Sequence, residues 1–591
     1  MMDAYDYVKL QLEVDPTRAT EKYLPLYEGH QWTLDDYQGI AQNNYQDEIF
    51  RTAWQQNHNV RLSGGSEGIR YNASLSYYDQ DGILLNSNYE RLQSRLNTLV
   101  KRGKLTINFN SNFSRSIQSG SSPSSSSYSG MNNLFYSVWG YRPVNYPGKS
   151  LDSLLNDLVD DDIDASNDYR FNPIADLKNA YRKYYVNNLQ LNGYVEYEFI
   201  KGLKLKVSGG WTYDNRHSDT FNNSKTRYGG PTSTDKVNAE VVRQQRLTWL
   251  NENILTYQTN FKSKHFLNAL LGVTLQNSDY EYYSLRMKQI PNESLGMAGM
   301  SQGTFDKSTS TLSSWSMLSY LGRVNYNYKE RYMLEANLRY DGSSRFVGDK
   351  RWGLFPSFSA GWNIAREDFF RPLAGVIGTL KLRGSWGQLG NNNTDKANAW
   401  YPFYQNMITG SANSGWLIDS KKQNTAQLPG IVNSLMTWET IESWDIGLDF
   451  GLLDNRLTGS VGYYNRYTYD MIGPAPILPP VLGALPPQVN NCDMKSYGWE
   501  LELSWRDRIS EFDYSARFVL SDGKRKILRY PNPTNSLSSD VYYNGQILGD
   551  IWGYKTVGIA QTQEEMNAHL ANGGTPNWGT NWGCLLYTSD A

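Results

Sequence analysis

Residues Trp499 to Trp505 read Trp-Glu-Leu-Glu-Leu-Ser-Trp, a strict alternation of apolar and polar side chains with an aromatic ring at each end. Successive side chains of a β-strand point to opposite faces, so the tryptophans and leucines share one face, and the glutamates and the serine share the other. Amphipathic rings favour the two membrane–water interfaces. The stretch therefore predicts a strand that turns one face to lipid and the other to water.

The same alternation recurs along most of the chain. The clearest predicted strands are residues 70–78, 104–114, 189–199, 203–213, 250–258, 266–276, 320–328, 332–340, 358–364, 380–388, 444–450, 457–467, 499–505 and 512–520. The strand 203–213 would be roughly 33 Å long and, tilted by about 40°, would span about 25 Å, the height of an outer-membrane apolar band. These strands predict an all-β fold, a transmembrane antiparallel β-barrel.

The predicted connections alternate between short and long. The short ones are 199–203, 258–266, 328–332, 450–457 and 505–512, and the long ones are 214–246, 277–319, 341–356, 389–440 and 468–497. Outer-membrane barrels have short periplasmic turns at one rim and long extracellular loops at the other. A soluble β-sandwich has no reason for this asymmetry.

The composition agrees with a barrel and excludes helical membrane proteins. Hydrophobic residues make up 39% of the chain and the mean hydropathy is -0.61, with no run of about 18 apolar residues. Aromatic residues make up 14%, as expected where many strands carry interfacial rings. A formal net charge of -2 gives no basic field, so we expect no nucleic acid as partner.

We expect no catalytic residue, metal or cofactor. Cys492 and Cys584 are too few for a disulfide framework or a thiolate metal site, and their pairing is open. The acidic run 160–164 alternates aspartates like a calcium loop, but Ala165 and Phe171 stand where an EF-hand needs Gly and Glu. No hydrolase, nucleotide-binding or metalloprotease motif occurs, and the histidines lack the spacing of metal pairs.

Aromatic residues of the long connection 389–440 are the candidate ligand or partner contacts. They are Trp400, Tyr401, Phe403, Tyr404 and Trp416, on a segment without strand periodicity. Large rings in a loop can stack on a sugar or a peptide. The alternative is that they pack the loop against the barrel rim or a partner protein.

Several longer stretches resemble a known family when they are taken together. They include Tyr45-Gln-Asp-Glu-Ile-Phe-Arg-Thr-Ala53, Asn57-His-Asn-Val-Arg-Leu-Ser-Gly-Gly65, Tyr340-Asp-Gly-Ser-Ser-Arg-Phe346, Arg351-Trp-Gly-Leu-Phe-Pro-Ser-Phe-Ser-Ala-Gly-Trp362 and Leu382-Arg-Gly-Ser-Trp-Gly-Gln-Leu-Gly-Asn391. On these, nearly the whole chain resembles the SusC/RagA-like group of TonB-dependent outer-membrane transporters.

The resemblance implies a barrel of the 22-stranded kind, closed by an N-terminal plug, in the bacterial outer membrane. It also implies energy from the TonB complex, a SusD-like surface lipoprotein as partner, contact with outer-membrane lipid, and import of glycans or peptides. We expect an internal fragment without signal peptide, plug or closing strands. Residues 1–56 would lead in from the plug, 57–583 would form the partial barrel, and 584–591 would be a non-native tail.

Three functions therefore stand as hypotheses. The first is an active importer energised through TonB, with no enzymatic activity. The second is a passive outer-membrane porin, which needs neither plug nor TonB. The third is a secreted, aromatic-rich β-protein that binds carbohydrate, which would have connections of regular size.

Overall fold

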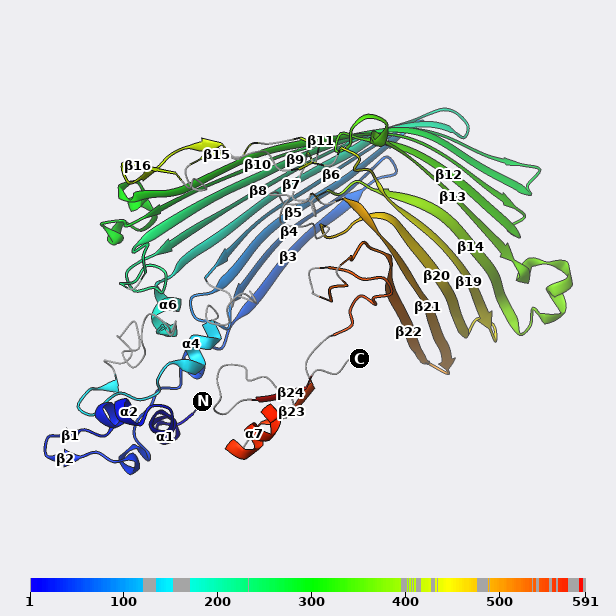
Figure 1. Cartoon of the computed structure of the whole chain (residues 1–591). Coiled ribbons are helices and arrows are strands. Elements are labelled where there is room, and N and C mark those ends of the chain that lie inside the picture. The colour runs from blue at the N-terminus through cyan, green and yellow to red at the C-terminus, as the bar shows by residue number, and fades with distance from the viewer. Residues whose placement is uncertain are drawn as a thin grey trace. The chain divides into compact units, whose positions relative to one another are not determined.

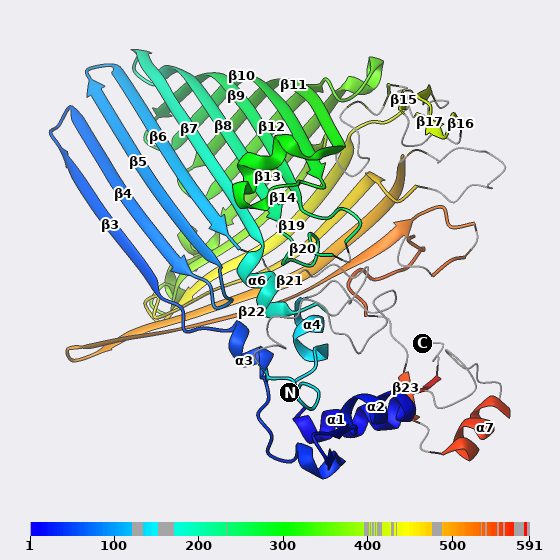
Figure 2. The same ribbon diagram turned by 90° about the vertical axis from the view of Figure 1, so that its left-hand side faces the viewer.

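The structure is a computed structural model (Figures 1 and 2). It describes residues 2–120, 134–151, 171–231, 233–394, 401, 403–404, 407, 409–410, 416–426, 431–432, 434–475, 487, 489–533, 535–537, 541–551, 555–559, 562–571 and 584–587. The acidic run 160–164 and Trp400 lie outside these residues. Two compact units are found, Met1–Phe358 with Asn398–Phe403, and Ser359–Ala397 with Tyr404–Ala591.

An antiparallel sheet of sixteen strands dominates the described chain, which confirms the predicted all-β barrel fold. In sheet order the strands are β22 (Phe512–Arg529), β21 (Asn490–Ile509), β20 (Leu457–Ile472), β19 (Glu439–Leu452), β14 (Ile377–Asn391), β13 (Trp352–Asn363), β12 (Tyr332–Ser343), β11 (Thr304–Tyr328), β10 (His265–Lys288), β9 (Asn238–Phe261), β8 (Leu203–Asn222), β7 (Tyr181–Ile200), β6 (Leu105–Ser119), β5 (Asn88–Arg102), β4 (Ile69–Asp81) and β3 (Gln55–Gly65).

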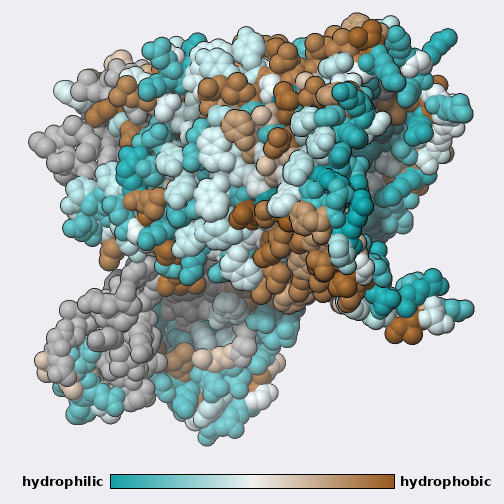
Figure 3. All heavy atoms as spheres, turned by 90° about the vertical axis from the view of Figure 1, so that its right-hand side faces the viewer, coloured by the Kyte–Doolittle hydropathy of each residue, from teal (hydrophilic) through white to brown (hydrophobic). Residues whose placement is uncertain are grey.

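Where the predicted alternation occurs, the strands have an apolar face and a polar face. In β21, Trp499 lies opposite Tyr463 of β20, and Leu501 lies opposite Val461. Many residues of the apolar face are large and exposed, for example Leu271 with 67% of its surface accessible. Figure 3 shows such hydrophobic side chains, in brown, at the surface among hydrophilic ones in teal. An apolar face that no protein covers is expected where lipid is the neighbour.

Aromatic rings border the apolar face at both ends. In the pair β11–β12, Tyr328 lies opposite Tyr332 at the short turn, and Tyr320 lies opposite Tyr340 at the other border. Trp352 of β13 stacks on Tyr340 with 4.8 Å between ring centroids. The eight residue steps from Tyr320 to Tyr328 span about 26 Å along the strand, or about 20 Å at a tilt near 40°, close to the height of a bilayer's apolar band.

The short turns match the twist of the strands they join. Lys262 and Ser263 between β9 and β10 have φ of 53° and 51°, and Lys329 and Glu330 between β11 and β12 have φ of 51° and 54°. Two successive left-handed residues are typical of the turn that fits a tight hairpin. The connections that precede β9 and β11 are longer, so the predicted alternation of short and long connections holds here.

The structure contains more strand than the clearest predicted strands, and one predicted loop was wrong. β3 and β5 were not predicted as strands, although Leu92, Leu96 and Val100 share the apolar face of β5. The predicted loop 277–319 is largely strand, because β10 continues to Lys288 and β11 begins at Thr304. Beyond the membrane band the outer face need not be apolar, so a strand there loses the alternation that reveals it.

The segment before β3 is helical and packs on the long connection between β6 and β7. It contains α1 (Ala4–Val14), α2 (Pro16–Tyr23) and α3 (Tyr45–Ile49). Tyr45 and Ile49 share a buried cluster with residues of α4 (Leu134–Gly140) and α6 (Pro173–Asn179). The Asn43 amide donates to the Pro143 carbonyl at 2.8 Å. The domain boundaries expected at residues 56 and 584 remain predictions.

The remaining elements are short. They are β1 (Leu26–Tyr27), β2 (His30–Gln31), η1 (Leu34–Tyr37), η3 (Glu293–Gln302), η4 (Gly348–Arg351), η5 (Ile364–Arg366), η6 (Asp368–Leu373), β15 (Thr409–Gly410), β16 (Leu417–Ile418), β17 (Lys421–Lys422), β18 (Thr425–Ala426), β23 (Lys555–Ile559), α7 (Gln563–Ala571) and β24 (Cys584–Tyr587). None of the described helices has the length and hydrophobicity to cross a membrane. Cys492 is buried with Met471 and Ile527.

Candidate functional site

Four of the five predicted aromatic contacts lie among the described residues, two in each compact unit. Tyr401 and Phe403 belong to the first unit and meet edge to face, with 6.5 Å between their ring centroids. The Tyr401 hydroxyl donates to the Ser314 carbonyl of β11 and accepts from the Ser314 amide, both at 2.8 Å. Tyr401 therefore fastens its loop to the extension of β11, which is the loop-packing alternative for this residue.

Tyr404 and Trp416 belong to the second unit and are exposed, with 62% and 74% of their surfaces accessible. Trp416 immediately precedes β16, which pairs with β17. The Trp416 carbonyl accepts from the Gln423 amide at 3.3 Å, so the backbone behind this ring is held in a hairpin. The role of Tyr404 and Trp416 as ligand or partner contacts remains a prediction.

The polar face of β3 to β7 carries a cavity that the sequence analysis missed. Its volume is about 560 Å³. The polar side chains that line it are Arg61, Ser63, Asn72, Ser74, Arg95, Asn97, Asn110, Ser111, Asn112 and Asn192. Amides and guanidinium groups can donate hydrogen bonds to hydroxyl, carbonyl or carboxylate oxygens. The alternate asparagines of β6, in the run Asn108-Phe-Asn-Ser-Asn112, were the available signal.

Hydrogen bonds across the strands hold these amides in place. The Asn97 side-chain amide donates to Oδ1 of Asn110, and the Asn110 side-chain amide donates to Oδ1 of Asn108 at 2.7 Å. Gln93 donates to Oδ1 of Asn112 at 3.2 Å. Because each amide has more donors and acceptors than these contacts use, the ordered row keeps hydrogen-bonding capacity for a ligand.

The polar face of the second unit holds a charged cluster around Arg383. Its guanidinium lies 3.5 Å from Asp445 and 3.4 Å from Asp449 of β19. Gly447 lies between these aspartates, and a Cβ there would be 2.7 Å from the guanidinium carbon. Glycine therefore gives Arg383 room to lie across the strand between both carboxylates.

The described residues offer no metal centre, because they contain no group of three or more His, Cys, Asp or Glu side chains placed to hold an ion. His265 contacts the Tyr326 hydroxyl at 2.7 Å, and His217 stacks on Tyr185 with 4.1 Å between centroids. Glu502, one of the alternating glutamates of β21, pairs with Arg517 at 2.9 Å. These contacts are those of polar residues on strand faces.

A family model described as TonB dependent receptor-like, beta-barrel, matches residues 125–583. The chain belongs to this family. Its fold as a TonB-dependent receptor barrel places it in the bacterial outer membrane. The family is one of receptors, whereas the porin and secreted-protein hypotheses name other kinds of protein.

Curated relatives are named as receptors of the same kind. The TonB-dependent receptor P3 of Formosa agariphila is 28% identical over 89% of this chain and 52% of its own length. The TonB-dependent receptor SusC of Bacteroides thetaiotaomicron is 26% identical over 85% of this chain and 50% of its own length. The chain thus spans about half the length of these curated relatives.

Solved structures share the fold. A chain of the RagAB peptide transporter aligns with a TM-score of 0.72 and 20% identity over 90% of this chain and 59% of its own length. The Escherichia coli outer-membrane transporter YddB aligns with a TM-score of 0.51 and 9% identity over 80% of this chain and 55% of its own length. The TonB-dependent receptor family expected from the sequence is confirmed, and the chain is similar to SusC in sequence and to a RagAB chain in fold.

Proposed function

We propose that the full-length protein is an active importer of oligosaccharides or peptides, energised through TonB and supplied by a SusD-like surface lipoprotein. The row of amides and arginines on the polar face of β3 to β7 carries this proposal. In a transmembrane barrel the polar face lines the lumen, so this row lies along the path of a transported molecule.

The chemistry of the cavity favours polar, uncharged or carboxylate-bearing cargo. Asn97, Asn110 and Asn112 present neutral amides, and Arg61 and Arg95 are the charged groups that line the cavity. Sugar hydroxyls and peptide amides both exchange hydrogen bonds with side-chain amides, while a peptide's terminal carboxylate also pairs with arginine. The name of the RagAB peptide transporter supports the peptide class, and the oligosaccharide class rests on the resemblance of the sequence to SusC/RagA-like transporters.

The cargo class can be tested by calorimetry on the full-length protein with neutral oligosaccharides and with peptides of similar size. Arg95→Gln should weaken peptide binding about tenfold and leave oligosaccharide binding within about twofold, because a charge-assisted hydrogen bond contributes about 1.5–3 kcal/mol. Arg91→Gln, on the same strand but outside the residues that line the cavity, is the control. If Arg95→Gln binds both peptides and oligosaccharides like the wild type, the cavity is not part of the import path.

The energy requirement separates an active importer from a passive pore. Uptake of the bound ligand by cells should stop when the TonB complex is deleted, while surface binding of the ligand continues. Deletion of an adjacent gene for a SusD-like lipoprotein should lower the capture of ligand at the cell surface. Uptake that persists at the same rate without TonB would overturn the proposal in favour of a porin.

A further inference from the structure

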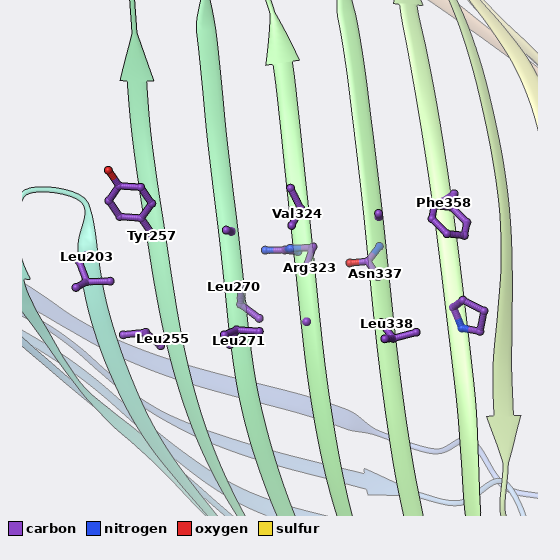
Figure 4. A pocket seen from close by; sticks show the side chains of 14 residues that line it. Leu203, Leu255, Tyr257, Leu270, Leu271, Arg323, Val324, Asn337, Leu338 and Phe358 are labelled. Atoms are coloured by element: carbon purple, nitrogen blue, oxygen red, sulfur yellow. The ribbon is translucent and has the colours of Figure 1, made fainter.

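An apolar groove with a volume of about 540 Å³ lies on the outer, apolar face of the first unit. Figure 4 shows its side chains in rows that cross neighbouring strands. One row joins Leu255, Leu271, Gly322 and Leu338, and the next joins Tyr257, Ala269, Val324 and Ala336. Leu203 and Phe358 also line the groove. It is therefore a depression in the surface that faces lipid.

Small residues make the floor of this groove and large ones make its walls. Ala269, Gly322 and Ala336 line the groove from β10, β11 and β12, and the larger lining residues include Leu271, which is 67% exposed, and Phe358, which is 55% exposed. A Cβ added at Gly322 would meet Leu271 Cδ2 at 3.5 Å, an ordinary contact. A Cβ at Gly322 would thus pack against Leu271 without a clash, and glycine leaves that room unfilled.

Basic residues crowd the short turns beside the groove. They are Lys201 between β7 and β8, Lys262 and Lys264 between β9 and β10, and Lys329 and Arg331 between β11 and β12, with Glu330 as the acidic residue among them. Lys201, Lys262 and Lys264 are exposed and form no ion pair with any described residue. The Lys329 amide donates to the Lys264 carbonyl at 2.7 Å, which joins two of the turns.

The spacing between groove and turns suits a molecule with an apolar tail and an anionic head. Lys262 follows the groove residue Tyr257 by five positions, and Lys329 follows Val324 by five. Five residues of strand span roughly 16 Å. A tail in the groove would therefore place its polar head at the level of the lysines, where interfacial cations are worth about 1 kcal/mol each toward anionic lipid.

We propose that this groove binds an anionic phospholipid of the periplasmic leaflet, with one acyl chain over Gly322 and the phosphate among Lys262, Lys264 and Lys329. Short turns lie at the periplasmic rim of an outer-membrane barrel, so the lipid comes from that leaflet. The excess of basic over acidic side chains at the three turns selects an anionic headgroup over a zwitterionic one.

Native mass spectrometry of the full-length protein in mild detergent tests the groove. The wild type should retain phosphatidylglycerol when exchanged against an equal mixture of phosphatidylglycerol and phosphatidylcholine. Gly322→Leu fills the groove and should lower retained lipid about tenfold. This is the effect expected if about two methylene groups of the acyl chain can no longer be buried. Gly209→Leu is the matched control, since it lies on the apolar face of β8 where a Cβ meets nothing within 4 Å.

The headgroup is tested by the triple variant K262Q/K264Q/K329Q, which should lose about tenfold of its preference for phosphatidylglycerol over phosphatidylcholine. The variant K101Q/R102Q/K104Q changes as many charges at the turn between β5 and β6, outside the groove, and should keep the preference. Equal lipid retention by the two glycine variants, or an unchanged preference in K262Q/K264Q/K329Q, would overturn the proposal. The heat-dependent shift in gel mobility of folded barrels verifies that each variant is folded.

Discussion

The Tyr401 hydroxyl is bound to both backbone groups of Ser314, accepting from the amide and donating to the carbonyl at 2.8 Å each. The two residues are 87 positions apart in the chain. An edge amide and carbonyl of β11 are thereby satisfied by a loop side chain, so this ring is a structural fastening on a strand that extends beyond the membrane band.

Tyr401→Phe should release this fastening, because it removes both hydrogen bonds and keeps the ring. The loss at an exposed site is about 1 kcal/mol, which corresponds to roughly fivefold faster hydrogen exchange of the Ser314 amide. The Ser316 amide donates to the Ser344 hydroxyl at 2.9 Å and is the internal control. Unchanged exchange at Ser314 would show that the bond to Tyr401 does not protect it.

Trp416→Ala should weaken ligand or partner binding about tenfold without changing stability. The ring is 74% exposed, so its removal should change the free energy of unfolding by less than about 0.5 kcal/mol. Trp54→Ala removes another ring, 80% exposed, outside the loop 389–440 and serves as the control. If both variants bind ligand and lipoprotein partner like the wild type, Trp416 is not a contact.

Gly447→Ala should destabilise the second unit by about 0.5–1 kcal/mol, because the added Cβ would displace the flexible end of the Arg383 side chain from its place across the strand. The ion pairs with Asp445 and Asp449 are more than a third exposed, so most of the loss should come from packing rather than from charge. Gly384→Ala is the control, since its nearest contact would be 3.5 Å. If the two variants have equal urea midpoints, a Cβ at position 447 does not disturb Arg383.

Asp36 should stabilise the turn η1 above pH 4 and release it in acid. The Thr33 amide and hydroxyl donate to Asp36 at 2.7 and 2.8 Å, and these bonds, with His30 at 3.2 Å, hold the pKa of Asp36 below its usual 3.8. The contribution is complete above the unfolded pKa and disappears as pH falls through the lowered folded pKa. The rate of pepsin cleavage near residues 33–37 should therefore rise more in the wild type than in Asp36→Asn as the pH is lowered. A ratio of the two cleavage rates that does not change with pH would contradict this.

The sequence predicted the membrane-spanning parts of the fold better than the rest. The lipid face of β21 must be apolar at Leu501 and Leu503, so the alternation is visible in the chain itself. In β10 the need for an apolar, lipid-facing side ends before Lys288. Beyond that point the strand is defined by its hydrogen bonds to neighbouring strands. Pairing between distant segments has no such local signature.

The candidate site was less predictable for the same reason. The alternating asparagines of β6 can be recognised in the sequence. Their fixed positions, however, depend on hydrogen bonds from Asn97 and Gln93 of β5, a strand that was not predicted. Tyr401 was selected as a ligand contact because its loop lacks periodicity. Its partner Ser314 lies in a region predicted as loop, so no pattern in the sequence pairs the two residues.

The extension of β9 and β10 has a mechanical consequence. Each strand contains 24 residues, about twice the number that a bilayer requires, and the two remain paired to within a residue of their ends. The paired ribbon therefore continues past the membrane band as a stiff wall, and a ligand of the proposed importer would meet a surface whose shape is set before contact. Such a surface loses little conformational entropy on binding, which leaves selectivity to the side chains along its rim.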